Sequence, residues 1–186
     1  LTLKDLSAGD LATVLSSGAT LLNGAITAGS ALNVEAALSI AMGEAATASL
    51  AGVARFAAVG DVALTGIDAG AVSVISQGGS LLDAGDVTTD IRANDVRIQA
   101  AGVGVLGAGV DNAIEVDAVR LSLHSGAGGA NILNAQALEI GTVGVVLQAV
   151  SFGGGTQTVS DAAQAGLISN GTVVVEIAVG DLVVSD

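Results

Sequence analysis

The chain has 186 residues, 18 of them acidic and 5 of them lysine or arginine, so its formal net charge is -13 with the single histidine neutral. Hydrophobic residues make up 51% of the chain, yet its only aromatics are 2 phenylalanines, and it has 27 glycines and no proline or cysteine. Scattered cations and missing stacking aromatics argue against nucleic acid and anionic lipid as partners. Without cysteine, disulfide frameworks, zinc fingers and thiol catalysis are excluded.

Two apolar stretches, residues 11–34 and 141–160, are long enough to test as membrane spans. The first carries no charge but holds 8 serine, threonine and asparagine side chains, and the second is similarly interrupted by polar residues and glycines. Such polar content is a poor insertion signal, so we expect no membrane insertion. The chain also lacks an initiator methionine and a basic leader, which favours a piece of a longer chain.

A repeated unit begins at Leu6, at Ile26 and again at Ile67. Each copy has an aliphatic residue, a small polar residue, Ala-Gly and then an alternating apolar run. The starts differ by 20 and 41 residues, which indicates a period of about 20.5 residues. The same period predicts degenerate copies near residues 46 and 87.

Short runs with apolar residues at alternate positions follow one another along the chain, as in strands with one buried face. They include Val62–Leu64, Val72–Val74, Val96–Ile98, Ile114–Val116, Val119–Leu123, Leu138–Ile140 and Val173–Val175. Turn dipeptides that tolerate positive φ separate them, among them Gly9-Asp10, Gly60-Asp61, Gly85-Asp86 and Gly180-Asp181. Short strands at a fixed period predict an all-β parallel β-helix, a solenoid of about nine coils of about 20 residues.

One segment fits a helix as well as a strand. Asn33–Met42 is rich in alanine and could be helical on propensity alone. Gly43 and Gly52 interrupt the region, and the repeat passes through it. We therefore expect strands there, with an inserted helix as the alternative.

The repeats resemble those of the filamentous-haemagglutinin-like large secreted exoproteins of Gram-negative bacteria. The Ile-Thr-Ala-Gly unit at Ile26 carries this resemblance, together with the stretches 91–123 and 126–143. In that family a glycine-rich corner is followed by an Asn-x-Ile-x-Val strand, a Gly-Gly turn and a Leu-x-Ile-Gly strand. The resemblance covers most of residues 6–185 and implies a right-handed β-helix shaft at the bacterial cell surface, with no catalytic residue to carry over.

No segment carries a complete catalytic, cofactor or metal motif. His124 follows the run Val119–Leu123, and as the only histidine, without cysteine or a neighbouring Gly-x-Ser-x-Gly, it is expected to be a solvated turn residue. Gly102–Gly107 matches a dinucleotide fingerprint without a following helix, and Gly78–Asp83 lacks the third glycine of the calcium-binding nonapeptide. The sequence thus predicts no catalytic, cofactor-binding or metal-binding residue and no cofactor.

We expect residues 1–186 to form a single solenoid segment, a fragment of a longer repetitive chain. Its predicted function is structural and non-catalytic, in an extracellular fibre or adhesin. Because both terminal sequences, Leu1–Leu3 and Val183–Asp186, are strand-like, the expected partners are flanking coils or neighbouring copies stacked end to end. A host or cell-surface glycan or protein is a further candidate partner. The alternatives are a glycan-binding or glycan-cleaving β-helix and a calcium-dependent adhesin module.

Overall fold

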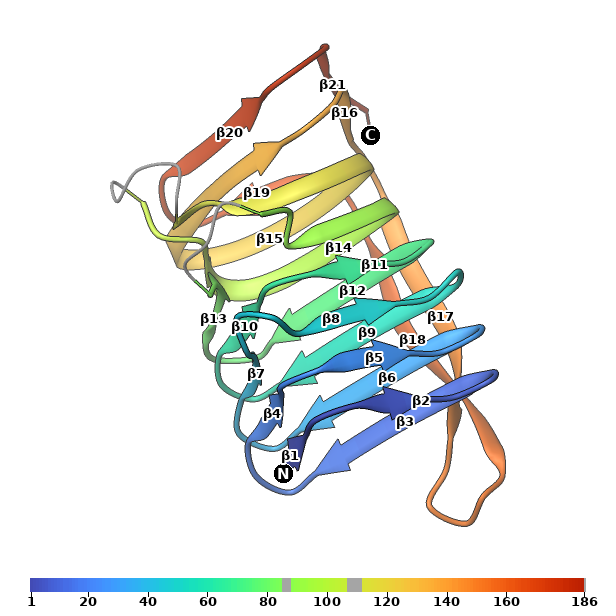
Figure 1. The fold of residues 1–186 in the computed structure, drawn as a ribbon. Coiled ribbons are helices and arrows are strands. Elements are labelled where there is room, and N and C mark those ends of the chain that lie inside the picture. Colours follow the sequence, from blue (N-terminus) through green and yellow to red (C-terminus); the bar gives the residue numbers. More distant parts are fainter. Residues whose placement is uncertain (85–87, 107–111, 186) are drawn as a thin grey trace.

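The structure is a computed structural model that describes residues 1–84, 88–106 and 112–185; within these ranges it contains strands and turns but no α-helix. The strands wind into a rod of stacked coils, with the N-terminus at one end and the C-terminus at the other (Figure 1). Strands of successive coils pair in parallel, which confirms the predicted all-β solenoid. In this part of the chain no helix is long and apolar enough to cross a membrane.

Each coil contributes strands to three ladders, which we call faces A, B and C. Face A consists of β1 (Thr2–Leu3), β4 (Thr20–Leu22), β7 (Ile40–Met42), β10 (Val62–Leu64), β13 (Ser80–Asp83) and β20 (Val173–Ile177). Face B consists of β2 (Leu6–Ser7), β5 (Ala25–Thr27), β8 (Thr47–Ser49) and β11 (Ile67–Asp68). Face C consists of β3 (Leu11–Ser16), β6 (Ala31–Ala36), β9 (Val53–Ala58), β12 (Ala71–Ser76), β16 (Leu138–Ile140), β19 (Leu167–Ser169) and β21 (Leu182–Val184). Two long strands, β14 (Ile91–Val103) and β15 (Ile114–Asn134), run across all three faces.

The strand register confirms the repeat but corrects its length. The equivalent positions on face B are Leu6, Ile26, Ala48, Ile67, Ile91 and Val116. The copy expected at residue 46 therefore starts two residues later, and the one expected at Val87 lies outside the described residues, with Ile91 as the paired position. The rod has about 6 turns roughly 22 residues apart, so the prediction of about nine coils is wrong.

The Ala-Gly of the repeat lies at the corner between faces B and C. There the coils stack so closely that a Cβ on Gly29 would lie 2.3 Å from the Gly9 carbonyl oxygen, and one on Gly52 would lie 1.8 Å from that of Ser30. A Cβ on either of these two glycines would therefore strike the backbone of the preceding coil. Close stacking explains why this dipeptide recurs.

Stacked apolar side chains of successive coils fill the interior. On face C the inward ladder consists of Val14, Val34, Phe56, Val74, Ile98 and Leu123, all at most 6% exposed. The Asn33–Met42 segment contributes to this core through β6 and β7, so the helical alternative is wrong. Its alanines are small enough for the narrow interior, and tertiary pairing overrides their helix propensity.

An antiparallel hairpin interrupts face C in the last complete coil. It consists of β17 (Val143–Val150) and β18 (Thr156–Gln164). Before the hairpin, Ile140 pairs with Leu121, and after it Leu167 pairs with Leu123, while Gly166 N–H donates to the Gly141 carbonyl at 3.1 Å. The hairpin is therefore an insertion into one strand position of an otherwise continuous ladder.

Candidate functional site

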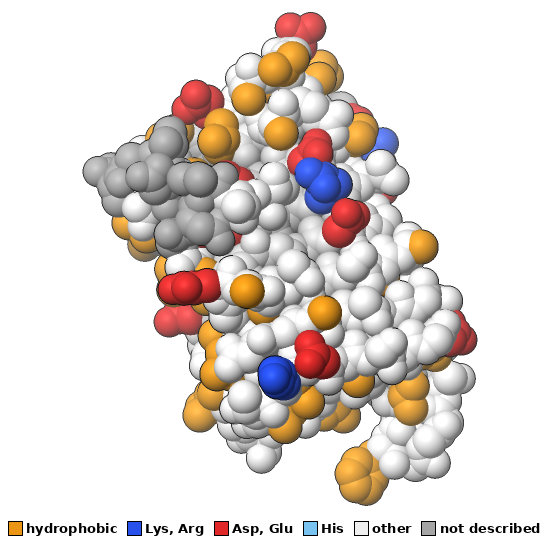
Figure 2. Space-filling view, viewed as in Figure 1, with side chains coloured by type: hydrophobic (Ala, Val, Ile, Leu, Met, Phe, Trp, Pro, Cys, Tyr) orange, Lys and Arg blue, Asp and Glu red, His pale blue; other side chains and the backbone are white. Residues whose placement is uncertain are grey.

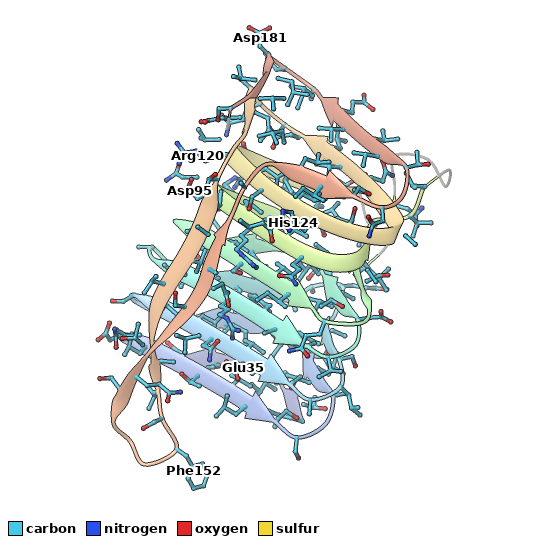
Figure 3. The ribbon with its side chains drawn as sticks, turned by 180° about the vertical axis from the view of Figure 1, so that it is seen from behind. Glu35, Asp95, Arg120, His124, Phe152 and Asp181 are labelled. Carbon is cyan, nitrogen blue, oxygen red and sulfur yellow. The ribbon has the colours of Figure 1, made fainter. Side chains whose placement is uncertain are left out.

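The hairpin of β17 and β18, which we call the strap, lies across the outer side of face C and runs along the rod (Figure 3). Beneath it the outward side chains of successive coils form one polar ladder of Thr13, Asn33, Arg55, Ser73, Arg97 and Ser122. An outward ladder on a single-layer solenoid would ordinarily face water. Here Asn33, Ser73, Arg97 and Ser122 are buried because the strap covers them.

Arg55 is the centre of the contact between ladder and strap. Its Nε donates to both carboxylate oxygens of Asp161 in β18, at 3.0 and 2.9 Å. Its Nη1 donates to Glu35 at 2.7 Å and to the Asn33 side-chain carbonyl at 3.1 Å. The Arg55 and Asp161 side chains are only 12% and 5% exposed, so this ion pair is largely shielded from solvent screening.

Polar contacts continue along the strap on both sides of that pair. Arg97 Nε donates to the Ala162 carbonyl at 3.1 Å, and Gln164 Nε2 donates to the Ile98 carbonyl at 2.8 Å. Near the tip, Val150 N–H donates to Thr13 Oγ1 at 2.8 Å. One hairpin thus contacts the rod from its first coil to its last complete ones.

Apolar side chains complete the inner side of the strap. Val143, Val145, Leu147 and Ala149 alternate with exposed residues along β17 and are at most 4% exposed. The first three form one apolar cluster with Ala31 of the rod, against which Leu11 and Val53 also pack. The strap is therefore an amphipathic hairpin docked on one face rather than a loose excursion.

A second constellation lies at the corner between faces A and B. One oxygen each of Asp83, Asp90 and Glu115 lie within 4.8 Å of one another, and Asp90 and Glu115 are buried. Asp83 ends β13, Asp90 precedes β14, and Glu115 is the second residue of β15. The Glu115 N–H donates to Asp90 Oδ2 at 3.0 Å.

Asp83 occupies an unusual place for an acid. It pairs in register with Leu64, whose side chain is fully buried in the core. The connection from face A to face B is short in the coil of Leu64, where residues 65–66 link β10 to β11, but spans residues 84–90 after Asp83 and 104–113 in the next coil. The three carboxyls therefore gather at the strand ends that these two longer segments join.

Burial governs the acidity of this cluster. The pKa of Asp90 is raised to about 9, chiefly because burial disfavours its charged form. The hydrogen bond from the Glu115 backbone lowers this pKa, and the carboxyls of Asp83 and Glu115 raise it further. Without a compensating cation, Asp90 therefore keeps its proton at neutral pH.

The candidate site residues examined in the sequence lie partly outside the strap contact and the carboxyl cluster. His124 lies within β15 rather than in a turn, half-buried, with Nε2 3.2 Å from the Ala165 carbonyl at the base of the strap, so the turn prediction is wrong. The Gly102–Gly107 stretch begins in the last two residues of β14, and its last residue lies outside the described residues. The Gly85-Asp86 turn also lies outside the described residues. The incomplete calcium motif at Gly78–Asp83 supplies Asp83 to the carboxyl cluster.

Two shallow grooves flank these features. One, of about 490 Å³, lies beside the strap and includes Glu35 and Arg55. The other, of about 650 Å³, lies on face B and includes Thr47, Asp68 and Arg92. In each groove one carboxylate pairs with an arginine, at 2.7 Å for Glu35 and 3.8 Å for Asp68. Both grooves offer hydrogen-bonding groups to a polar ligand.

Comparison of the chain with protein-family models, curated proteins and solved structures finds no match.

Proposed function

We propose that this chain is a structural, non-catalytic segment of an extracellular fibre or adhesin shaft of the filamentous-haemagglutinin-like kind. Its coils continue into flanking coils of the same chain or into neighbouring copies. The observation that carries this proposal is the open core at both ends of the rod.

Several inward side chains at the two ends are only partly buried, unlike their equivalents between them. Leu6 is half-buried, whereas Ile26, Ile67 and Ile91 on the same ladder are at most 2% exposed. At the other end Val173 and Val175 are likewise packed on one side only. Among the described strands, β1, β2 and β3 pair with one neighbour each, and so do β20 and β21. Open edges and an open core match the ends of another coil stack.

The strap is consistent with a structural role, because it couples distant coils of the rod. In a plain solenoid each coil contacts only its neighbours, so stability is close to a sum of local terms. The strap adds contacts that join Thr13, Arg55 and Arg97 to one hairpin. Because it ties distant coils together, opening one coil also breaks strap contacts, and the rod resists local unfolding.

The surface suits a solvated shaft. Acidic side chains are spread along the side of the rod seen in Figure 2 rather than gathered in one patch. Two arginines sit between acids of the adjacent coils: Arg92 lies 3.8 Å from Asp68 and 3.1 Å from Asp117, and Arg120 lies 3.1 Å from Asp95 and 3.2 Å from Glu139. These ladders hold adjacent coils in register, and the remaining negative charge on the sides of the rod disfavours side-by-side association.

Antibodies raised against the purified rod test this proposal on cells that make the full gene product. We expect them to label intact cells and fibres seen by electron microscopy, and brief external protease to remove the label. Labelling only after permeabilisation would overturn the extracellular assignment.

Glycan binding is the second candidate function, because the face B groove offers Thr47, Asp68 and Arg92 to a polar ligand. A polysaccharide panel separates the two functions. Binding or cleavage that disappears in Asp68→Asn would replace the structural assignment with a glycan-directed one. Equal behaviour of Asp68→Asn and wild type supports the shaft.

A further inference from the structure

We propose that Asp83, Asp90 and Glu115 bind one calcium ion at the corner between faces A and B. This site does not depend on the proposed shaft function, because it rests on side-chain geometry within the rod. It joins β13 and the starts of β14 and β15, and therefore two successive coils.

The spacing of the oxygens fits the size of calcium. One oxygen from each carboxyl lies within 4.8 Å of the other two. Calcium binds oxygens at about 2.3–2.6 Å, so ligands on opposite sides of the ion lie about 5 Å apart. Magnesium binds at about 2.0–2.1 Å in a strict octahedron and retains several waters, which a buried corner accommodates poorly. An all-oxygen set without histidine or cysteine also disfavours zinc.

Buried oxygens without a donor point to a missing positive charge. Both carboxylate oxygens of Asp83 and Oδ1 of Asp90 are shielded from solvent and accept no hydrogen bond. Asp90 as a whole is 0% exposed. Burying carboxylates without donors or a cation is costly, and nearby like charges add to that cost. A divalent cation compensates both effects at once.

The position of Asp83 strengthens the assignment. Its ladder neighbour Leu64 is fully buried, so an aliphatic side chain fits this ladder position. An acid here weakens the apolar core unless it performs another task. Holding the end of β13 and the starts of β14 and β15 together through one ion is such a task, because the three carboxyls come from these strand ends.

The experiment uses the full chain, stripped with a chelator and titrated with calcium chloride, and separately with magnesium chloride, by calorimetry. Thermal unfolding is followed by far-UV circular dichroism, because the chain has no tryptophan or tyrosine. We expect one calcium per chain, weaker magnesium binding, and a Tm higher by about 5 °C or more in saturating calcium. Asp83→Asn and Asp90→Asn should each weaken calcium binding at least tenfold.

The control is Asp68→Asn combined with Asp117→Asn, which removes two acids from the surface ladder on face B and leaves the cluster intact. It should bind calcium as wild type does. If calcium neither binds the chain nor changes its Tm, the proposed site is overturned. The carboxyls then share protons instead. Binding that survives in both cluster variants would overturn it as well, because the ion would then be held by the general negative surface. The wild-type titration decides the matter even if a variant fails to fold.

Discussion

At the scale of single residues, the glycines of the B-to-C corner show how closely the coils stack. We predict that Gly29→Ala destabilises the rod by about 3 kcal/mol, because its Cβ would lie 2.3 Å from the backbone oxygen of Gly9. Gly9→Ala is the matched control, since it holds the same motif position and a Cβ there meets nothing within 4 Å. Urea unfolding followed by circular dichroism measures both. Equal midpoints for the two variants would contradict the close-stacking explanation.

Asn134 illustrates a second residue-scale device, a side chain that replaces missing backbone partners at a corner. It is fully buried, accepts from Ala118 N–H at 3.0 Å and donates to the carbonyls of Ala118 and Gln136 at 3.2 and 2.7 Å. We predict that Asn134→Ala costs about 2–4 kcal/mol, because these backbone groups lose their partner. Asn131→Ala, which removes one exposed hydrogen bond to Val105, should cost below about 1 kcal/mol in the same urea experiment.

These residues differ in how far sequence predicts them. The Ala-Gly corner is visible because it recurs at Gly9 and Gly29. Asn134 and the carboxyl cluster do not recur, and the cluster forms only because Leu64 is replaced by Asp83 on its ladder. Leu64 and Asp83 lie only 19 residues apart, whereas the mean spacing of the coils is roughly 22 residues, so no uniform period would have revealed this replacement.

At the scale of elements, the strap depends on one shielded ion pair. We predict that Asp161→Asn destabilises the rod by about 3 kcal/mol, because it leaves the Arg55 guanidinium mostly buried with only the half-exposed Glu35 as its charged partner. Glu35→Gln should cost below about 1 kcal/mol, since that carboxylate is 42% exposed and is screened by water. Limited proteolysis should cut β17–β18 faster in Asp161→Asn than in Glu35→Gln. Equal cutting rates would show that the apolar inner side alone holds the strap.

The insertion site of the strap leads to a second element-scale prediction. Ile140 pairs with Leu121 and Leu167 with Leu123, so Gly141 alone suffices to fill the position between them. Removal of residues 142–166 should therefore leave a folded solenoid with a lower Tm and a broader, less cooperative unfolding transition. Circular dichroism during heating measures both, and a chain without strand signal at low temperature would refute the insertion.

The strap was beyond sequence analysis for a physical reason. Alternation along Val143–Val150 identifies a strand, but nothing local shows that its partner is β18 in an antiparallel hairpin rather than the next coil. The cations Arg55 and Arg97 look scattered along the chain, yet the fold places them on one ladder with Ser73 between them. The insertion also adds residues without adding a coil, which helps to explain why about 6 turns form instead of about nine.

At the scale of the whole molecule, the open ends predict a way to separate folding from assembly. Gly29 and Gly52 would direct a Cβ into the backbone of the preceding coil, whereas Gly9 lies in the first coil and would direct it toward the open end. If a second copy continues the stack in the same register, Gly9→Ala should leave the Tm of the single rod unchanged and reduce end-to-end assembly at least tenfold. Gly78→Ala is the control, because its Cβ would lie 3.5 Å from the nearest atom, an ordinary contact.

The tip of the strap extends past the first coil, with Phe152 fully exposed (Figure 3). Phe152→Ser should therefore weaken the same end-to-end assembly by removing an apolar contact with the next copy. Concentration-dependent sedimentation and electron microscopy measure the assemblies, and filaments of Gly9→Ala equal to wild type would show that the coils do not continue through a second copy.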